Sequence, residues 1–302
     1  MTRVAVLMGG WSAEREVSLV TGEACAKALE SLGYDVVRID VERRALCEEL
    51  IRAKPDVVFN GLHGRFGEDG FVQGLLEMMA LPYTHSGVLA SALAMNKPEA
   101  KVLFRDAGIA VPEGAVMTRR ELAASRNFVP PLVLKPLNEG SSVGVEIIME
   151  GDNFRPQDQG DPEERLLVEK YIPGREIQVA VMGDRALGAI EIVSPGRFYD
   201  YEAKYAPGGS KHLMPAPMPE ADYELALDYS LRAHKALGCR GLTRSDLRYD
   251  DTGGGEGGLY LLEVNTQPGM TPTSLAPEIA AHQGISFEDL CRELVEDASC
   301  DR

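Results

Sequence analysis

The sequence lacks several features that would have pointed to a nucleic-acid or membrane protein. Its 302 residues carry 47 acidic and 31 basic side chains, and the resulting formal charge of −16 argues against nucleic acid as a partner. It contains no run of about eighteen apolar residues, so no membrane span is predicted. The apolar stretch at residues 4–8 is too short for the core of a signal peptide. We therefore expect a cytoplasmic protein.

Cysteine is scarce and irregularly spaced, and two common nucleotide-binding motifs are missing. The five cysteines, at positions 25, 47, 239, 291 and 300, form neither a CxxC pair nor a zinc-ligand pattern, so we expect reduced thiols. A Walker A sequence is absent, and no GxGxxG follows a predicted strand. These absences argue against P-loop and classical dinucleotide-binding folds.

The first 95 residues alternate short apolar runs with helix-like segments. Strands are expected at 3–8, 34–40 and 56–60, with a helix at about 16–32 between the first two. This order predicts a parallel sheet with helical crossovers, that is, an open α/β domain. Ligands of such sheets gather at the carboxyl ends of the strands, where the loops 9–18 and 62–70 lie.

From about residue 96 the pattern changes. A helix to about residue 108 is followed by closely spaced strand-like segments, which predict antiparallel pairing and α+β elements within an α/β protein. The polar stretch 150–165 is expected to be a loop or at most a short helix. The remainder contains a long polar loop at 194–212, a helix at about 221–237, two strands flanking a glycine-rich turn, and two closing helices.

The strongest local signal of a site is a pair of strand motifs, RSDL and LLEVN. Side chains two apart in a strand share a face, so Glu263 and Asn265 point the same way, and Asp246 on the preceding strand can meet them across the hairpin. Two carboxylates and an amide oxygen suit Mg²⁺ that also holds substrate phosphates. The alternative is a chance pair of exposed strand carboxylates.

A second signal is Lys135, which ends an apolar strand before a loop rich in glycine and serine. Small residues such as Ser141 and Ser142 let backbone N–H groups close around phosphate oxygens, and the lysine adds positive charge. A glycine-rich hairpin with an edge lysine is the alternative. Lys97 at a helix start, and Lys170 beside Glu169, could flank the same nucleotide or be ordinary solvated lysines.

Two residues in the amino-terminal loops could bind a small cationic or zwitterionic substrate. Glu14 follows the first predicted strand, and His63 follows a later one. The glutamate could instead favour the amino terminus of the next helix, and a lone histidine is often structural. Composition does not separate these possibilities.

Taken together, the motifs resemble those of the ATP-grasp enzymes and, within them, the D-alanine–D-alanine ligases. The motifs that carry the resemblance occur in the family's order and spacing and run through most of the chain: GGWSAEREVSL, LHGRFGEDG, LPYTHSGVLASALAMNK, EGSSVG, FYDYEAKY and LLEVNTQPGMTPTSL. The segment 150–165 departs from the pattern, because many relatives carry a longer helix there. That departure bears on the packing of the central domain.

The resemblance implies three domains, at residues 1–95, 96–172 and 173–302, with ATP held between two antiparallel sheets. Two Mg²⁺ ions, or Mn²⁺ in their place, would be bound by Asp246, Glu263 and Asn265. The residues implied to contact ATP are Lys97, Lys135, Ser142, Glu169, Lys170, Ile172, Glu176 and Lys204.

The resemblance also implies a reaction in which the carboxylate of one D-alanine attacks the γ-phosphate of ATP. The amine of a second D-alanine then attacks the resulting acyl phosphate. Arg244 and the backbone N–H of Gly269 would stabilise the oxyanion that forms in this second step. The product would supply cell-wall peptidoglycan precursors.

Further residues of the family motifs are implied to bind the two amino acids. Glu14 would pair with the first ammonium group and His63 would lie near the first carboxylate, while Ser274 and Leu275 would bind the second carboxylate. Ser141 and Tyr205 would complete a hydrogen-bond link from Glu14. The loop that carries Lys204 and Tyr205 would be a lid that excludes water.

Three alternatives stay open at this point. A related ligase could join another carboxylate and amine, a variant could use D-lactate as second substrate, or a non-catalytic relative could keep the fold alone. The EAKY pattern at 202–205 favours an amine over D-lactate, and the retained metal and arginine positions favour an enzyme. A homodimer is expected from the resemblance and from the frequency of two-fold assemblies.

Overall fold

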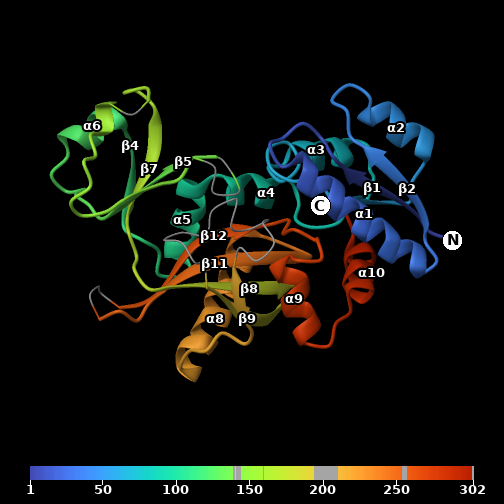
Figure 1. Cartoon of the computed structure of the whole chain (residues 1–302). Helices are drawn as coiled ribbons and strands as arrows, with labels where there is room; N and C mark the ends of the chain where they lie inside the picture. The colour runs from blue at the N-terminus through green and yellow to red at the C-terminus, as the bar shows by residue number, and fades with distance from the viewer. Residues whose placement is uncertain (139, 141–143, 159, 194–209, 254–256, 301–302) are drawn as a thin grey trace.

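Three sheets form a row along the molecule in the computed structural model, which describes residues 1–138, 140, 144–158, 160–193, 210–253 and 257–300. The four-stranded sheet lies at one end, the five-stranded sheet in the middle and the three-stranded sheet at the other end (Figure 1). Each sheet falls within one of the three predicted domain ranges. The mixed α/β and antiparallel fold class is thereby confirmed, while the domain boundaries stay a prediction.

The amino-terminal sheet is parallel, as the alternation of strands and helices predicts. Its strand order is β2-β1-β3, with β1 in the centre. The elements of this part are β1 (Arg3–Met8), α1 (Arg15–Ser31), β2 (Asp35–Asp40), α2 (Leu46–Ala53), β3 (Val57–Asn60), α3 (Phe71–Met78) and α4 (Val88–Met95).

Helix α1 packs against β1 through one face. Its buried positions Val17, Thr21, Cys25 and Leu29 recur at the spacing of one helical face. Gly22 permits the close approach, because a Cβ there would lie 2.4 Å from the Cβ of Met8. This packing sets the direction of the loop that joins β1 to α1 and carries Glu14.

The other two sheets are antiparallel, in the orders β4-β7-β5-β6 and β10-β9-β8-β11-β12. The polar stretch 150–165 contains a single short 3₁₀ helix, η1, as expected. The remaining elements are α5 (Lys97–Asp106), β4 (Gly114–Thr118), α6 (Arg119–Ala124), β5 (Leu132–Pro136), β6 (Glu146–Ile148), η1 (Pro156–Asp158), β7 (Arg165–Lys170), β8 (Arg175–Met182), β9 (Arg185–Val193), β10 (Lys211–Leu213), α8 (Glu220–Leu237), β11 (Leu242–Asp250), β12 (Gly258–Asn265), α9 (Leu275–His282) and α10 (Phe287–Asp297).

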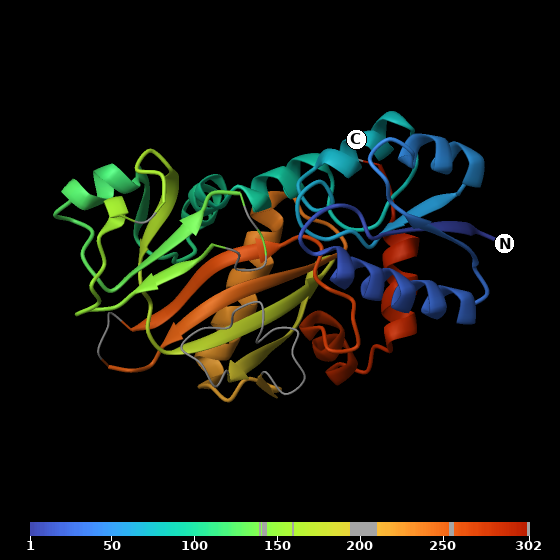
Figure 2. The same ribbon diagram turned by 45° about the horizontal axis from the view of Figure 1, so that its top comes forward.

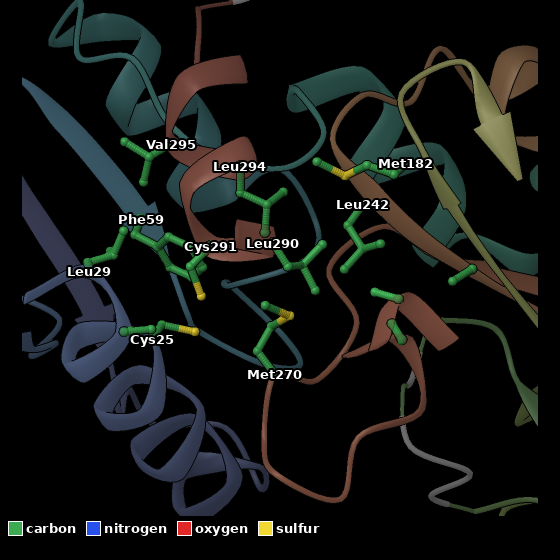
Figure 3. Close-up of a cluster of buried hydrophobic side chains, with 14 of the residues drawn as sticks. Cys25, Leu29, Phe59, Met182, Leu242, Met270, Leu290, Cys291, Leu294 and Val295 are labelled. Carbon is green, nitrogen blue, oxygen red and sulfur yellow. The ribbon is translucent and has the colours of Figure 1, made fainter. Parts of the chain in front are cut away.

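The end of the described chain returns to the amino-terminal sheet. Helix α10 packs against α1 and β3, and their side chains form one core with residues of β8 and β9. Figure 3 shows Cys25 of α1, Phe59 of β3 and Cys291 of α10 within this core. The five cysteines, all of which are among the described residues, form no disulfide. Among the described residues, no helix is long and apolar enough to cross a membrane.

Helices α4 and α5 connect the amino-terminal part to the two antiparallel sheets. Both contact β12, and α5 also packs on α8, beside the large sheet (Figure 2). Helix α5 begins at Lys97, where the side chain of Asn96 accepts a hydrogen bond from the backbone N–H of Glu99 at 3.4 Å. The cap fixes the first turn of α5 and thereby the position of Lys97 at the edge of β12.

Candidate functional site

A cavity lies where the large sheet meets the amino-terminal loops and the start of α5. It encloses about 970 Å³, counting its open mouth. Nine of the residues that were singled out from the sequence line this cavity. These are Glu14, His63, Lys97, Arg244, Glu263, Asn265, Gly269, Ser274 and Leu275.

The carboxylates of the predicted metal site lie side by side. In the pairing of β11 with β12, Asp246 lies opposite Glu263 and Arg244 lies opposite Asn265, so all four side chains share a sheet face. The register shifts directly after Asp246. The pairing confirms the shared face that the alternation of the strands predicts, whereas metal binding itself stays a prediction.

Both carboxylates are paired with cationic side chains. Arg244 donates from Nε and Nη2 to the two oxygens of Asp246, at 2.7 and 3.0 Å. The Nζ of Lys97 lies 3.3 Å from Oε2 of Glu263. These pairs neutralise the row of carboxylates until another cation replaces them.

The donor set fits a hard divalent cation. It comprises two carboxylates and the amide oxygen of Asn265, which already accepts a hydrogen bond from the backbone N–H of Gln267 at 2.8 Å. Among the described residues, no group of three or more histidine, cysteine or acidic side chains could hold a metal ion. An oxygen site of this composition therefore relies on the asparagine and on phosphate oxygens to complete it.

Lys135 lies in a buried charge cluster that includes one residue overlooked in the sequence. Its Nζ is 2.9 Å from Oε2 of Glu169, and Nζ of Lys101 is 2.6 Å from Oε1 of the same carboxylate. Both contacts are ion pairs. Two buried lysines thus share one buried glutamate, which leaves one excess positive charge.

Burial and charge act against each other in this cluster. Burial lowers the pKa of Lys101 to about 8, despite the opposing effect of Glu169. Burial also favours the neutral form of Lys135, but the charges of Glu169 and Glu263 outweigh it and raise its pKa. The two lysines likewise overcome burial and lower the pKa of Glu169. The cluster therefore holds its carboxylate ionised beside the site.

Four of the residues predicted to contact ATP lie in or next to the link from β7 to β8. Glu169 points to the lysine cluster, whereas Lys170 is 48% exposed and pairs with Glu113. The backbone oxygen of Ile172 accepts a hydrogen bond from Arg248 at 3.2 Å. Glu176 lies opposite Arg248 in the pairing of β8 with β11.

On the amino-terminal side, His63 is held at both ring nitrogens. Nδ1 lies 3.0 Å from Oε1 of Glu68, and Nε2 lies 2.9 Å from the hydroxyl of Thr21. Glu14 is buried and lies near the backbone of Gly140. A Cβ added at Gly140 would lie 3.7 Å from Oε1 of Glu14. The parallel sheet brings these loops together at one edge, as the carboxyl ends of parallel strands require.

The third wall is the amino terminus of α9. The hydroxyl of Ser274 accepts a hydrogen bond from the backbone N–H of Thr271 at 2.9 Å, and Leu275 begins the helix. The backbone of Gly269 lies close to Ser274: a Cβ added at Gly269 would lie 2.8 Å from the Ser274 hydroxyl oxygen. Backbone N–H groups at a helix start favour a carboxylate. Ser141, Ser142, Lys204 and Tyr205 lie outside the described residues.

Sequence reasoning overlooked three buried residues next to this site. Lys101 lies one turn after Lys97 on α5, and Glu68 belongs to the same loop as His63. Gln178 lies two residues after Glu176, on the same face of β8. The spacing of each relative to a recognised residue was the available signal.

Two antiparallel sheets, a buried lysine cluster and a row of carboxylates between them define an ATP-grasp enzyme. A family model described as "D-ala D-ala ligase C-terminus" matches residues 103–296, and one described as "D-ala D-ala ligase N-terminus" matches residues 44–86. The chain belongs to the D-alanine–D-alanine ligase family.

Individual relatives agree with this assignment over the whole chain. The chain is 59% identical to the D-alanine–D-alanine ligase of Paramagnetospirillum magneticum over 99% of both sequences. It is 57% identical to that of Ruegeria pomeroyi, over 99% of this chain and 97% of the relative. The crystal structure of the Bacillus anthracis D-alanine–D-alanine ligase complexed with ATP has a TM-score of 0.82 and 33% identity, covering 98% of this chain and 96% of that one.

Proposed function

We propose that this protein joins two molecules of D-alanine to D-alanyl-D-alanine, with ATP converted to ADP and phosphate, for the synthesis of peptidoglycan precursors. The observation that carries the proposal is the single cavity lined by both the amino-terminal loops and the sheet. Glu14 offers an anion for an ammonium group on one side, and Arg244 offers a cation for a developing oxyanion on the other. The family of the chain supplies the identity of the amino acid.

In the first step, a carboxylate oxygen of one D-alanine attacks the γ-phosphorus and ADP leaves. The product is D-alanyl phosphate. Lys97 and the one excess positive charge of the Lys101–Glu169–Lys135 cluster reduce the repulsion between the anionic carboxylate and the phosphate. Asp246, Glu263 and Asn265 would hold Mg²⁺, or Mn²⁺, which neutralises phosphate charge when bound.

In the second step, the amine of the other D-alanine attacks the acyl carbon and phosphate leaves. Arg244 and the backbone N–H of Gly269 stabilise the negative charge on the former carboxyl oxygen. Ser274 and the start of α9 bind the carboxylate of this second D-alanine. The second D-alanine must lose a proton from its ammonium group before or during the attack.

Two broader features complete the proposal. The three domains, at 1–95, 96–172 and 173–302, enclose the substrates, and the protein acts as a homodimer in the cytoplasm, where ATP and D-alanine are available. Ser141, Ser142, Lys204 and Tyr205 belong to the proposed site through the family motifs in which they stand.

The test is phosphate release from Mg-ATP, measured with and without D-alanine, with the products identified by mass. Release that depends on D-alanine and is accompanied by the dipeptide is the expected result. L-alanine alone, and D-alanine with D-lactate, serve as comparisons for stereochemistry and for the second substrate. ATP binding without D-alanine-dependent release would contradict the proposed substrate.

A matched variant tests the role of the amino-terminal loops. Glu14→Gln keeps the shape of the side chain and removes its charge. We expect this variant to bind ATP normally and to lose most D-alanine-dependent release, because the ammonium group loses its partner. Unchanged kinetics for D-alanine would contradict the assignment of Glu14.

A further inference from the structure

Gln178 is a buried amide whose hydrogen-bonding groups are both unused. It lies on β8 with no exposed side-chain surface, and neither Oε1 nor Nε2 has a hydrogen-bond partner in the part of the chain that the structure describes. Removing an amide from water without replacing its hydrogen bonds is unfavourable. Such a group in a folded protein calls for an explanation.

Two other buried glutamines have a structural role, and both ends of each amide are hydrogen-bonded. Gln73 donates to the backbone oxygen of Gly67 at 2.8 Å and accepts from the backbone N–H of Gly70 at 3.1 Å. Gln267 accepts from the side chain of Asn60 at 2.7 Å and donates to the backbone oxygen of Leu62. Both are as buried as Gln178 and use each end of the amide. Gln178 differs in pointing to no such partner.

The position of Gln178 in the sheet indicates a role in the site. Across the large sheet, it lies opposite Asp246, which in turn lies opposite Glu263, so the three side chains form one row on the face of the sheet that holds the site. Along β8 it follows Glu176 on the same face, so it extends the row of Asp246 and Glu263 onto β8 next to that residue. It also lines the cavity together with Arg244 and Lys97.

We propose that Gln178 binds the nucleotide, its Nε2 donating a hydrogen bond to a phosphate oxygen of ATP. This inference rests on the proposed function, which puts ATP across this face of the sheet. A phosphate group offers only acceptors, so it needs a donor such as the amide NH₂. A neutral donor next to Asp246 and Glu263 also adds no negative charge to repel the phosphates, as a third carboxylate would.

The substitution Gln178→Met tests the proposal, because methionine is unbranched, similar in length and apolar. The ligand-free variant should melt at a higher temperature than the unmodified protein, since an unpaired buried amide has been removed. Its dissociation constant for the Mg²⁺ complex of a non-hydrolysable ATP analogue, measured by calorimetry, should rise about tenfold. Its affinity for D-alanine should not change.

Gln73→Met is the matched control. It removes an amide that is hydrogen-bonded at both ends, so the backbone N–H of Gly70 loses its acceptor, while the backbone oxygen of Gly67 keeps only its hydrogen bond from Asn60. The melting temperature should therefore fall, while the dissociation constant for the nucleotide analogue stays unchanged. Opposite changes in melting temperature for two buried glutamines would distinguish a ligand-binding amide from a structural one.

A second variant, Gln178→Glu, keeps the shape and introduces a negative charge beside the phosphates. It should weaken nucleotide binding more than Gln178→Met does. The proposal is overturned if Gln178→Met lowers the melting temperature and leaves nucleotide affinity unchanged. It is also overturned if only the affinity for D-alanine falls, because the amide would then serve the other anionic substrate.

These measurements are independent of the ligase reaction. If the unmodified protein binds the nucleotide analogue but makes no dipeptide, the proposed function fails and the role of Gln178 is still decided by the two variants. If the dipeptide forms and the variants behave like the control, the role of Gln178 fails and the ligase function stands.

Discussion

The two facing walls of the cavity are built from different interactions. On the amino-terminal wall, His63 is held by the hydroxyl of Thr21 and the carboxylate of Glu68, each through one ring nitrogen. On the sheet wall, the charged side chains form ion pairs, of which Arg244 with Asp246 and Lys97 with Glu263 lie at the proposed metal site.

The difference between hydrogen bonds on one wall and ion pairs on the other indicates how each wall can bind its ligand. In the proposed site, the hydrogen bonds of His63 would orient its side chain before a small amino acid binds. The ion pairs on the sheet use the same oxygens that a metal ion would bind, so in the proposed site they would exchange partners when the nucleotide and its cation bind. The proposal therefore puts a wall that is oriented in advance opposite a wall that changes its charge partners on binding.

The largest effect on turnover is expected from a substitution on the sheet wall. Asp246→Asn removes a carboxylate of the proposed metal site and the negative charge that pairs with Arg244. We expect kcat to fall at least about 100-fold, as when a group that stabilises transition-state charge is lost. Steady-state kinetics across a range of Mg²⁺ concentrations would measure it.

Asp250→Asn is a suitable control for this change. Asp250 stands at the end of the same strand and accepts hydrogen bonds from Thr252, away from the cavity lining. Its substitution should leave kcat close to that of the unmodified protein. Near-normal turnover in Asp246→Asn would contradict the metal assignment.

A smaller effect on kinetics is expected from removing a hydrogen bond on the amino-terminal wall. Thr21→Val keeps the shape of the side chain and removes the hydroxyl that holds Nε2 of His63. The KM for D-alanine should rise about tenfold, the effect of leaving one buried polar group unpaired, whereas the KM for ATP should not change. An equal rise in both KM values would show that the two walls are not independent.

The third prediction concerns how the free energy of unfolding depends on pH. The pKa of Lys101 is about 8 in the folded protein, because of burial, against an ordinary value near 10.5. Between these values the unfolded chain holds a proton that the folded protein has released, so this residue makes the folded state relatively more stable as pH rises. The charged lysine therefore costs stability at neutral pH, and that cost declines progressively between about pH 8 and pH 10.5.

Urea unfolding of the unmodified protein and of Lys101→Met at pH 7, 9 and 10 would measure this contribution. The stability of the unmodified protein relative to the variant should increase above pH 8, by at most roughly 1.4 kcal/mol per pH unit. A difference that is constant or that shrinks with pH would contradict the titration of Lys101 in the buried cluster.

The smallest effect is expected at an exposed pair. Glu113→Gln removes the partner of Lys170, whose side chain is 48% exposed. The free energy of unfolding should change by less than about 0.5 kcal/mol, because exposed ion pairs contribute little. A change of several kcal/mol would mean that charge pairs outside the cavity matter as much as those within it.

Much of the site could be predicted because its residues lie in regular or recognisable local patterns. The two-residue period of strands was enough to put Glu263 beside Asn265, and the hairpin was enough to bring Asp246 opposite Glu263. The family motifs supplied positions, such as Lys97 and Ser274, that periodicity alone does not distinguish from ordinary surface residues.

The overlooked residues depend on contacts between segments distant in the sequence. Lys101 resembles any lysine on a helix until β7 brings Glu169 within 2.6 Å of it. Gln178 is an ordinary strand residue until its burial and its lack of a partner in the described structure are known. The packing of α10 against α1 likewise joins the two ends of the described chain, which no local pattern indicates.

The measurement that tests the proposed reaction most directly uses D-alanine labelled with ¹⁸O in its carboxylate. If the carboxylate attacks ATP, one labelled oxygen bridges to phosphorus in the acyl phosphate and leaves with it when the amine attacks. The account predicts that the phosphate released with each dipeptide carries one ¹⁸O from D-alanine. Released phosphate without ¹⁸O would show that water, not D-alanine, accepts the phosphoryl group, and would contradict the proposed reaction.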